Sequence, residues 1–489
     1  MTPVQRNLGL LAIVTFGFIA RAATTGAPLF DHHSWRQADT AMIARNFAES
    51  RLNPLYPQID HRGALLVGYV ATGFELQAWL VALIARATGF DPQIGRLLSA
   101  LWFVGSLLLL FRLTRRRYGD VPALATAFVY AFGLPLVLFI ERAFLNEALL
   151  LCLSFAVLDA TDRRVRGGGA VWLLTACLCL ALIGAVKPTF LIVAAGVVAL
   201  YVERDGLRAV LRLEPYAIVG CGAISAALWL SWASSLGQST GLSFGLTDKL
   251  FDAAVLFDHG YWVKVTRRLF KDLFGPIGIA AAVLGMTTAW RERRLMEIAL
   301  VIGSIAYLII VTPGNYHHDY YQIPLVPGVT ILCGVGLTIA LDHLGWFQIQ
   351  PPRTQLVIRV VAFWLLPMTT LVRSVSSHNW YEVDVDREAL CSELKPALRR
   401  DDLVAFYGQQ SPDLMFCTGS RGWLLQPGDG VTERLATALR EGATVVVSPA
   451  AMASNLPGGI TATPPLADST EFVAFRVPPS LRPLSPGGM

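Results

Sequence analysis

The sequence predicts a mainly α-helical transmembrane bundle followed by a small α/β domain outside the membrane, and three observations lead to this fold class. Of the 489 residues, 54% are hydrophobic and only 15% are charged, whereas about 25% of an ordinary soluble domain is charged. The mean hydropathy is +0.52, which excludes a soluble globular protein. After residue 370, long apolar runs give way to short apolar segments and amphipathic stretches, which predicts the soluble domain.

Eleven apolar runs are long enough to cross about 30 Å of hydrocarbon. They lie near residues 8–24, 97–113, 121–139, 144–160, 171–186, 188–202, 215–235, 274–290, 296–312, 322–341 and 357–374. The first run lacks a convincing small-residue cleavage site, so we expect a retained anchor helix. A twelfth apolar run, 64–85, carries Glu75 and Gln77 in its middle.

Arginine clusters decide between eleven and twelve crossings, because short cytoplasmic loops are enriched in Lys and Arg. With eleven crossings the N-terminus and all the clusters are cytoplasmic, whereas with twelve crossings every cluster would face outward. The clusters are 112–117, 163–166, 204–212, 291–294 and Arg353. We therefore expect 64–85 to be a juxtamembrane or re-entrant segment of a first outer loop that contains juxtamembrane helices. The outer loop 236–273 is the exception, since it holds five basic residues: Lys249, Lys264, Arg267, Arg268 and Lys271.

Two domains follow from this topology. Residues 1–376 form the membrane domain, and residues 377–489 form a soluble periplasmic α/β domain with a Pro- and Gly-rich tail that we expect to be disordered. We expect helices at 387–400 and 432–442 and strands at 403–406, 443–448 and 472–477. Cys391 and Cys417 would face an oxidising compartment, where a disulfide and two free buried thiols both fit the sequence.

Polar residues that are costly at membrane depth gather on the predicted outer side, which indicates one outer site. The candidates are Asp31, His33, Arg36, Gln37, Asp39, Glu75, Glu141, Arg142, Glu147, Lys187, His318, Asp319, Tyr320 and Tyr321. Plainer interpretations exist: Asp39 could cap a helix, Arg142 and Lys187 could extend to the interface, and a tyrosine could belong to an aromatic belt. Lys187 precedes Pro188 at an expected helix start, where the helix dipole gives no reason for a cation.

Composition and spacing also limit the partners. The net charge of +5 comes from arginine clusters between apolar runs, which do not form the basic face that nucleic acid requires. Five of the seven cysteines lie in apolar runs without metal-ligand spacing. Adjacent histidines such as His317 and His318 rarely bind one metal together. The sequence therefore assigns no metal ligands, and it leaves a divalent metal open without requiring one.

Four segments resemble, in their order and common sidedness, bacterial C-type-fold (GT-C) glycosyltransferases. They are HSWRQADTAMIARNF (33–47), RAFLNEALL (142–150), the pair at 187–188 and HHDYYQIPLVPG (317–328). The likeness covers about residues 1–375, and the most similar group contains protein O-mannosyltransferases and lipid A aminoarabinose transferases. It implies an inverting enzyme of the bacterial inner membrane that moves a hexosyl or pentosyl unit from a polyprenyl-phosphate carrier to a lipid, glycan or protein acceptor on the periplasmic face.

The resemblance also implies residue roles. The family places an acidic pair in the first outer loop to deprotonate the acceptor hydroxyl, but Arg36 and Gln37 stand there in this chain. The base role therefore passes to Asp39, with Asp31 as the alternative. The other roles fall in three groups: phosphate binding by Arg142, Lys187, Arg36 and the 264–271 cluster, orientation of sugar hydroxyls or cations by Glu75 and Glu147, and lining of the sugar pocket by residues 317–321.

Two rival functions stay open. One is a transporter or flippase for a lipid-linked sugar, and the other is an O-antigen ligase or polymerase that uses a lipid-pyrophosphate donor. A transporter usually shows an internal repeat and has little use for a large outer domain; the sequence has no evident repeat and predicts such a domain. The ligase differs only in its donor, which the sequence does not specify.

Overall fold

The computed structural model describes residues 1–245, 248–343, 372 and 379–481. These residues form two compact units, each assembled from separated stretches of the chain. Unit 1 contains residues 1–25, 95–232 and 245–378, and unit 2 contains residues 26–94, 233–244 and 379–489. Apart from Val372, the predicted span 357–374 lies outside the described residues, as does the predicted domain boundary at 376.

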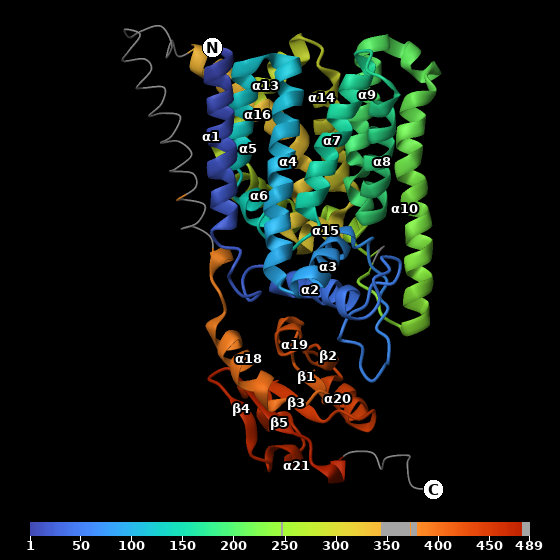
Figure 1. Cartoon of the computed structure of the whole chain (residues 1–489), viewed down its shortest axis with the longest axis vertical. Coiled ribbons are helices and arrows are strands. Elements are labelled where there is room, and N and C mark those ends of the chain that lie inside the picture. Colours follow the sequence, from blue (N-terminus) through green and yellow to red (C-terminus); the bar gives the residue numbers. More distant parts are fainter. Residues whose placement is uncertain (246–247, 344–371, 373–378, 482–489) are drawn as a thin grey trace. The chain divides into compact units, whose positions relative to one another are not determined.

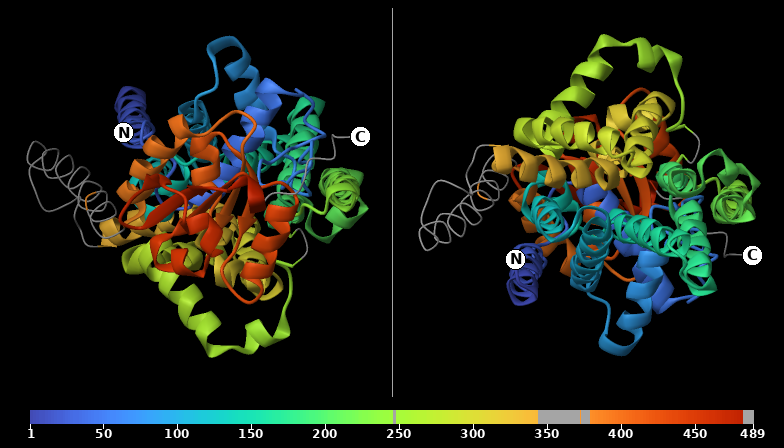
Figure 2. Two further views of the ribbon diagram at one scale, coloured as in Figure 1. Left: turned by 90° about the horizontal axis from the view of Figure 1, so that it is seen from below. Right: turned by 90° about the horizontal axis from the view of Figure 1, so that it is seen from above.

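Unit 1 is a helical bundle in which α1, α4, α5, α7 and α16 run side by side, as the side view (Figure 1) and the end-on views (Figure 2) both show. Its longer helices are α1 (Pro3–Ala22), α4 (Pro92–Tyr118), α5 (Asp120–Phe132), α7 (Glu147–Val165), α8 (Ala170–Val186), α9 (Ala194–Asp205), α10 (Leu213–Thr240), α13 (Gly275–Arg291), α14 (Leu295–Ile310) and α16 (Val326–His343). Shorter elements are α6 (Pro135–Ile140), η1 (Pro188–Val193), η2 (Gly206–Leu211), α11 (Ala253–Phe257), α12 (His259–Arg268), η3 (Leu269–Leu273), α15 (Thr312–His317) and η4 (Asp319–Leu325). The first three residues of α4 and the end of α10 belong to unit 2.

Local sequence sets the ends of these helices. At the start of α1, the Thr2 hydroxyl accepts the backbone N–H of Gln5, and the Gln5 side chain accepts the backbone N–H of Thr2, which is a capping box. Pro135 begins α6 and Pro188 begins η1, because proline lacks an amide hydrogen and fits the first turn of a helix. The predicted span 121–139 is therefore interrupted, whereas 188–202 is helical throughout, as the 3₁₀-helix η1 followed directly by α9.

Four helices in the described part of the chain are long and apolar enough to cross a membrane unaided: α1, α4, α10 and the continuous helix Asp319–His343. A fifth results if α12–η3 and α13, which meet at 94°, count as one span. The predicted runs near 121–139, 171–186 and 296–312 correspond to apolar helices of 10–17 residues. The helix α3 (Leu76–Thr88) in the ambiguous run has 13 residues, too few to cross about 30 Å. The count of eleven crossings stays a prediction.

Small residues let α13 and α16 approach closely. A side chain at Gly336 of α16 would overlap the carbonyl of Ala281, and one at Gly285 of α13 would overlap the carbonyl of Leu332. Association of helices in lipid depends on such close packing, because lipid tails give no hydrophobic driving force between them. The glycines in these two apolar runs therefore allow the close contact between α13 and α16.

The arginine clusters meet acidic residues at one end of the bundle. Arg116 of α4 pairs with Asp159 of α7 at 2.7 Å. The buried Arg117 pairs with Glu297 of α14 at 2.7 Å and with Glu203 of α9 at 2.9 Å. The clusters at the C-terminal ends of α4, α7 and α9 and the one that precedes α14 thus share one end, as the predicted topology requires. That this end is cytoplasmic stays a prediction.

Unit 2 contains a mixed sheet built from the five strands of the described chain. They are β1 (Leu403–Tyr407), β2 (Arg421–Leu425), β3 (Val445–Pro449), β4 (Pro465–Asp468) and β5 (Phe472–Arg476), in the order β2-β1-β3-β5-β4. The first three strands in this order are parallel, and β5 is antiparallel to both neighbours. The strands β1, β3 and β5 match the predicted ones. The strands β2 and β4 were not predicted, because β2 contains a glycine and β4 a proline, and both residues are disfavoured inside strands.

Helices cover both faces of this sheet. They are α18 (Val385–Ala397), α19 (Asp413–Thr418), α20 (Val431–Arg440) and α21 (Gly458–Thr461). Leu390 and Leu394 of α18 pack with Phe406 on one face, and Leu435 of α20 packs with Val446 on the other. The predicted helices 387–400 and 432–442 are thus present, each with slightly different ends.

The first outer loop folds together with this C-terminal module. Its helices are α2 (Ser34–Glu49) and α3, and α2 contacts α19. Arg45 of α2 donates to the carbonyl of Phe416 at 3.1 Å. The backbone N–H of His32 donates to the carbonyl of Trp380 at 3.1 Å, and that of Asp384 donates to the carbonyl of Phe30 at 3.0 Å. Residues near both ends of the chain therefore share one unit.

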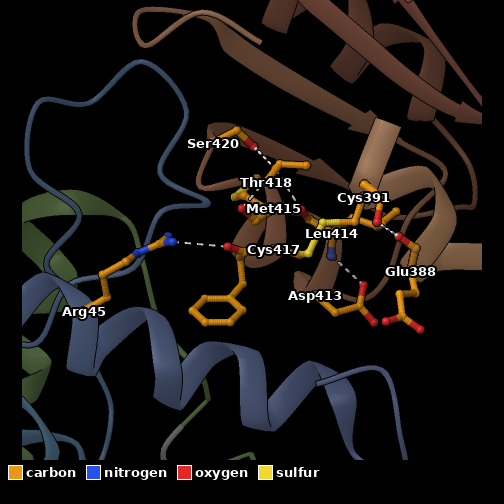
Figure 3. Close-up of a disulfide and its surroundings, with 11 residues drawn as sticks. Arg45, Glu388, Cys391, Asp413, Leu414, Met415, Cys417, Thr418 and Ser420 are labelled. Carbon is orange, nitrogen blue, oxygen red and sulfur yellow. Dashed lines mark hydrogen bonds between the residues drawn. A yellow bond between two sulfur atoms is a disulfide. The ribbon is translucent and has the colours of Figure 1, made fainter. Parts of the chain in front are cut away.

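Cys391 and Cys417 form a disulfide that joins α18 to α19 (Figure 3). Their Cα atoms are 6.2 Å apart and 26 positions separate them in sequence. Next to the bridge, the hydroxyls of Thr418 and Ser420 are hydrogen-bonded at 2.8 Å. Of the two states that the sequence left open, the structure contains the disulfide.

Replacing both cysteines by serine should destabilise the C-terminal module by about 3 kcal/mol, because the unfolded loop is no longer closed. Hydrogen exchange of the full-length protein checks this, through faster exchange of amides in β1 and α18. The matched control, Cys177→Ser with Cys221→Ser, removes two thiols from unit 1 and should leave those amides unchanged. Equal protection in both variants would contradict the prediction.

Asp402 should make the module sensitive to acid. Burial would raise the pKa of its carboxyl, but bonds from the Arg476 guanidinium, the Arg399 backbone N–H and the Thr444 hydroxyl outweigh this and lower the pKa. Because the folded pKa lies below the unfolded value of about 4, the stabilisation is complete above that value and is lost as pH falls through the folded pKa. Asp402→Asn should therefore speed amide exchange in β1 and β3 at pH 6, with the difference from wild type shrinking below about pH 4. A difference independent of pH would contradict this.

Candidate functional site

A charged pair lies at the end of the unit 1 bundle opposite the arginine clusters. Lys187 Nζ is 2.8 Å from Glu147 Oε1, and the side chains are 17% and 6% exposed. Glu147 occupies the first turn of α7, where the helix dipole favours a carboxylate. Lys187 lies between α8 and η1. In the described chain one of its three N–H donors goes to Glu147, so the ammonium retains capacity to bind a second anion.

Two tyrosines flank the same ammonium. Lys187 Nζ is 4.0 Å from the ring centroid of Tyr321 and 4.7 Å from that of Tyr320. The Tyr307 hydroxyl donates to the carbonyl of Tyr321 at 2.7 Å, and the His318 ring stacks on Tyr320. A cation between aromatic faces is stabilised when water is scarce. The sequence candidates Glu147, Lys187, His318, Tyr320 and Tyr321 are thus brought together, and the buried Asp319 adjoins them in η4.

A second buried charge cluster fixes the neighbouring turn. Arg21 of α1 donates from Nε and Nη2 to Glu141 Oε2, at 2.9 and 2.7 Å, and the Tyr130 hydroxyl donates to Glu141 Oε1. The next residue, Arg142, is buried and donates to the carbonyl of Thr24 at 2.9 Å. Arg142 therefore does not extend to the interface, and its position depends on the end of α1.

In unit 2, α2 presents the predicted base. Asp39 is buried, and its Oδ1 lies 3.1 Å from His61 Nε2. His61 is partly exposed, and its ring stacks on that of Phe244, with the two ring centroids 6.0 Å apart. Asp39 lies in the second turn of α2, whose N-cap is His33, so the capping interpretation of Asp39 is wrong. His33 itself adopts a left-handed backbone conformation, with φ of 58°.

The other first-loop candidates form two adjacent pairs. Arg36 Nη2 lies 3.1 Å from Glu75 Oε1, which also accepts the Thr72 hydroxyl at 2.9 Å. Gln37 Nε2 donates to Asp31 Oδ1 at 2.7 Å. Arg36 and Gln37 thus each bind a carboxylate supplied from elsewhere in the loop.

Two sequence interpretations need correction or addition. Lys187 precedes the start of η1, but it is also the C-cap of α8, and the helix dipole favours a cation at the C-terminal end of a helix.

The sequence alone did not indicate His61 and Phe244 as residues of the site. His61 lies in the same outer loop as Asp39, and that shared loop was the available signal. Phe244 follows α10, more than 180 positions later, and no sequence signal connects it to the loop.

One carboxylate cluster in the C-terminal module has the spacing of a metal site. Ligand atoms of Asp384, Asp386 and Glu471 lie within 4.8 Å of one another. However, Asp384 caps α18 and pairs with Arg387 at 3.1 Å, and Asp386 accepts the Thr470 hydroxyl. These protein partners explain the cluster, so we assign it no metal.

Comparison with known proteins agrees with this fold. The family model described as dolichyl-phosphate-mannose-protein mannosyltransferase matches residues 76–232. No curated protein sequence matches the chain. The matched range contains Arg142, Glu147 and Lys187, and it ends before Tyr320.

Solved structures match over much more of the chain. ArnT from Cupriavidus metallidurans bound to undecaprenyl phosphate superposes with a TM-score of 0.68 at 13% identity, covering 99% of this chain and 100% of ArnT. An oligosaccharyltransferase from Archaeoglobus fulgidus gives 0.55 at 12% identity, covering 91% and 68% of the two chains. The mycobacterial arabinofuranosyltransferase AftD gives 0.51 at 14% identity, covering 98% and 42%. The resemblance to GT-C glycosyltransferases is confirmed: the chain has their fold, and it is a multi-pass membrane protein.

Removing one member of the Arg21–Glu141 pair should be more harmful than removing both. Arg21→Met leaves the fully buried Glu141 carboxylate without its cation, which costs about 3–5 kcal/mol. The double variant Arg21→Met/Glu141→Leu should recover much of this loss in thermal unfolding of the purified protein in detergent. Losses that simply add in the double variant would contradict the pairing.

Proposed function

We propose that this chain is an inverting glycosyltransferase of the bacterial inner membrane, which moves a hexosyl or pentosyl unit from a polyprenyl-phosphate carrier to a lipid, glycan or protein acceptor. The observation that carries the proposal is the Lys187–Glu147 pair between two tyrosines, at the end of an apolar bundle. A cation in such poorly hydrated surroundings suits a lipid phosphate, whose negative charge grows as the sugar leaves. ArnT, which has the same fold, binds undecaprenyl phosphate, and this supports the carrier class.

The reaction requires one bond to form while another breaks. The acceptor hydroxyl oxygen attacks the anomeric carbon, the bond from that carbon to the phosphate oxygen breaks, and the electron pair leaves with the lipid phosphate. Lys187 and Arg142 stabilise the phosphate, and Glu147 holds Lys187 in place. A carboxylate must take the hydroxyl proton. We assign that role to Asp39, oriented by His61, with Asp31 as the alternative.

The proposed orientation places the chemistry and the C-terminal module in the periplasm. The Cys391–Cys417 disulfide supports this, because disulfides persist in oxidising compartments. The arginine clusters at the other end of the bundle support a cytoplasmic position for that end.

Purified protein in nanodiscs should release polyprenyl monophosphate from one member of a panel of polyprenyl-phosphate and polyprenyl-pyrophosphate sugars, given an acceptor extract. Asp39→Asn should lower this turnover by about 10²-fold or more, because general base catalysis is lost, and Asp31→Asn should have a smaller effect. Lys187→Gln should also lower turnover, since the phosphate loses a cation. Release is measured by chromatography of the lipid product.

Arg208→Gln serves as the control, because it removes an exposed arginine of η2 and should leave turnover unchanged. Pyrophosphate release would replace the proposal by the ligase reaction. Absence of turnover, with labelled lipid-linked sugar crossing the bilayer of reconstituted vesicles, would replace it by a transporter.

A further inference from the structure

The basic segment of the long outer loop runs across the bundle. Helix α12 and the π-helical turn η3 together meet α13 at 94°. Because α13 packs along α16, which lies within the spanning helix Asp319–His343, α12–η3 runs close to parallel with the membrane plane. Figure 2 shows this yellow-green segment on the rim of the unit 1 bundle in both views.

One face of α12 is fixed to the bundle. Tyr261 and Val265, four positions apart, are buried. Arg268 Nη1 donates to the carbonyl of Asn315 at 2.6 Å, and Lys264 Nζ is 4.4 Å from the ring centroid of Tyr316. Two of the four basic residues of α12–η3 thus face the protein. Since Asn315 and Tyr316 precede η4, the segment lies at the same end of the bundle as Lys187.

The opposite face combines aromatic and basic side chains. Trp262 and Phe270 are 40% and 44% exposed, and Phe257, the last residue of α11, is 85% exposed. Arg267 and Lys271 are exposed on the same face. Among the described residues, no ion pair or hydrogen bond from either of these two basic side chains is found. Exposed aromatics beside Lys and Arg are typical of helices that lie in the interface of a bilayer.

We propose that this face of α12–η3, defined by Trp262, Phe270, Arg267 and Lys271, lies in the membrane interface and binds the headgroups of anionic phospholipids. The aromatic rings enter the boundary of the acyl chains, and the two cations lie at the level of the lipid phosphates. The orientation favours a bilayer over a soluble partner, because a helix at right angles to the spanning helices presents its outer side to the membrane surface. This inference requires only that the bundle spans a membrane, and not that the chain transfers sugars.

A fluorophore on the exposed face tests the proposal with the full-length protein. Val263→Cys, labelled with bimane and reconstituted in phosphatidylcholine nanodiscs, is quenched by a doxyl group placed near the headgroup of either phosphatidylglycerol or phosphatidylcholine. At equal mole fractions the phosphatidylglycerol quencher should be more effective by about twofold or more, because each basic residue near the surface enriches anionic lipid. The preference should fall when salt is raised, since the interaction is screened. Protein that retains Val263, treated with bimane in the same way, gives the labelling blank.

Charge removal identifies the residues responsible. Arg267→Gln/Lys271→Gln should abolish the preference for phosphatidylglycerol while the label stays in the interface. Arg399→Gln/Arg400→Gln removes the same charge from exposed positions of the C-terminal module and should preserve it. Equal quenching by the two lipids, or efficient quenching by aqueous iodide, would overturn the proposal. So would loss of the preference on adding inorganic phosphate or about 1 mol% undecaprenyl phosphate, which would identify a specific phosphate site instead.

Discussion

The cost of burying charge in an apolar bundle governs the structure of unit 1. At one end, Arg117 is buried against Glu297 and Glu203, and at the other, Arg21 is buried against Glu141. Each ion pair connects helices that are distant in sequence, so charge pairing specifies which helices are neighbours in a medium that offers no hydrophobic preference between them. The Lys187–Glu147 pair obeys the same constraint, but its lysine is partly exposed and can accept an anionic ligand.

The Lys187–Glu147 pair lies at the end of the bundle where several helices are interrupted. Proline at positions 135 and 188 and glycine at 133 stop helices short of the membrane thickness. The side chains that meet there come from the start of α7, from the junction of α8 with η1, and from η4. Irregular backbone at this depth is tolerated only when protein covers it, and here the neighbouring helices do so. A bundle of uninterrupted helices would have no comparable place for polar side chains.

Composition and motif order predicted the fold better than they predicted the contacts between individual residues. Apolar runs identified the helices, and the order of four motifs identified the fold, because both depend on features that persist along the sequence. The partners of individual side chains could not be predicted. Asp39 was expected to be a base or a cap, but its bond to His61 depends on how the loop after α2 turns back. The predicted span 121–139 contains a break between α5 and α6, because hydropathy does not register the proline at 135 that divides it. The disulfide was one of two states that the sequence allowed.

The packing of α2 against α19 has a consequence for how the protein is made. Helix α2 emerges early from the ribosome, whereas the helix that it contacts, and the Cys391–Cys417 bridge that secures that helix, are synthesised in the last quarter of the chain. The loop that bears Asp39 therefore cannot complete its packing against α19 until translation is nearly complete. This unit is finished late in synthesis, and its bridge forms only where the compartment is oxidising.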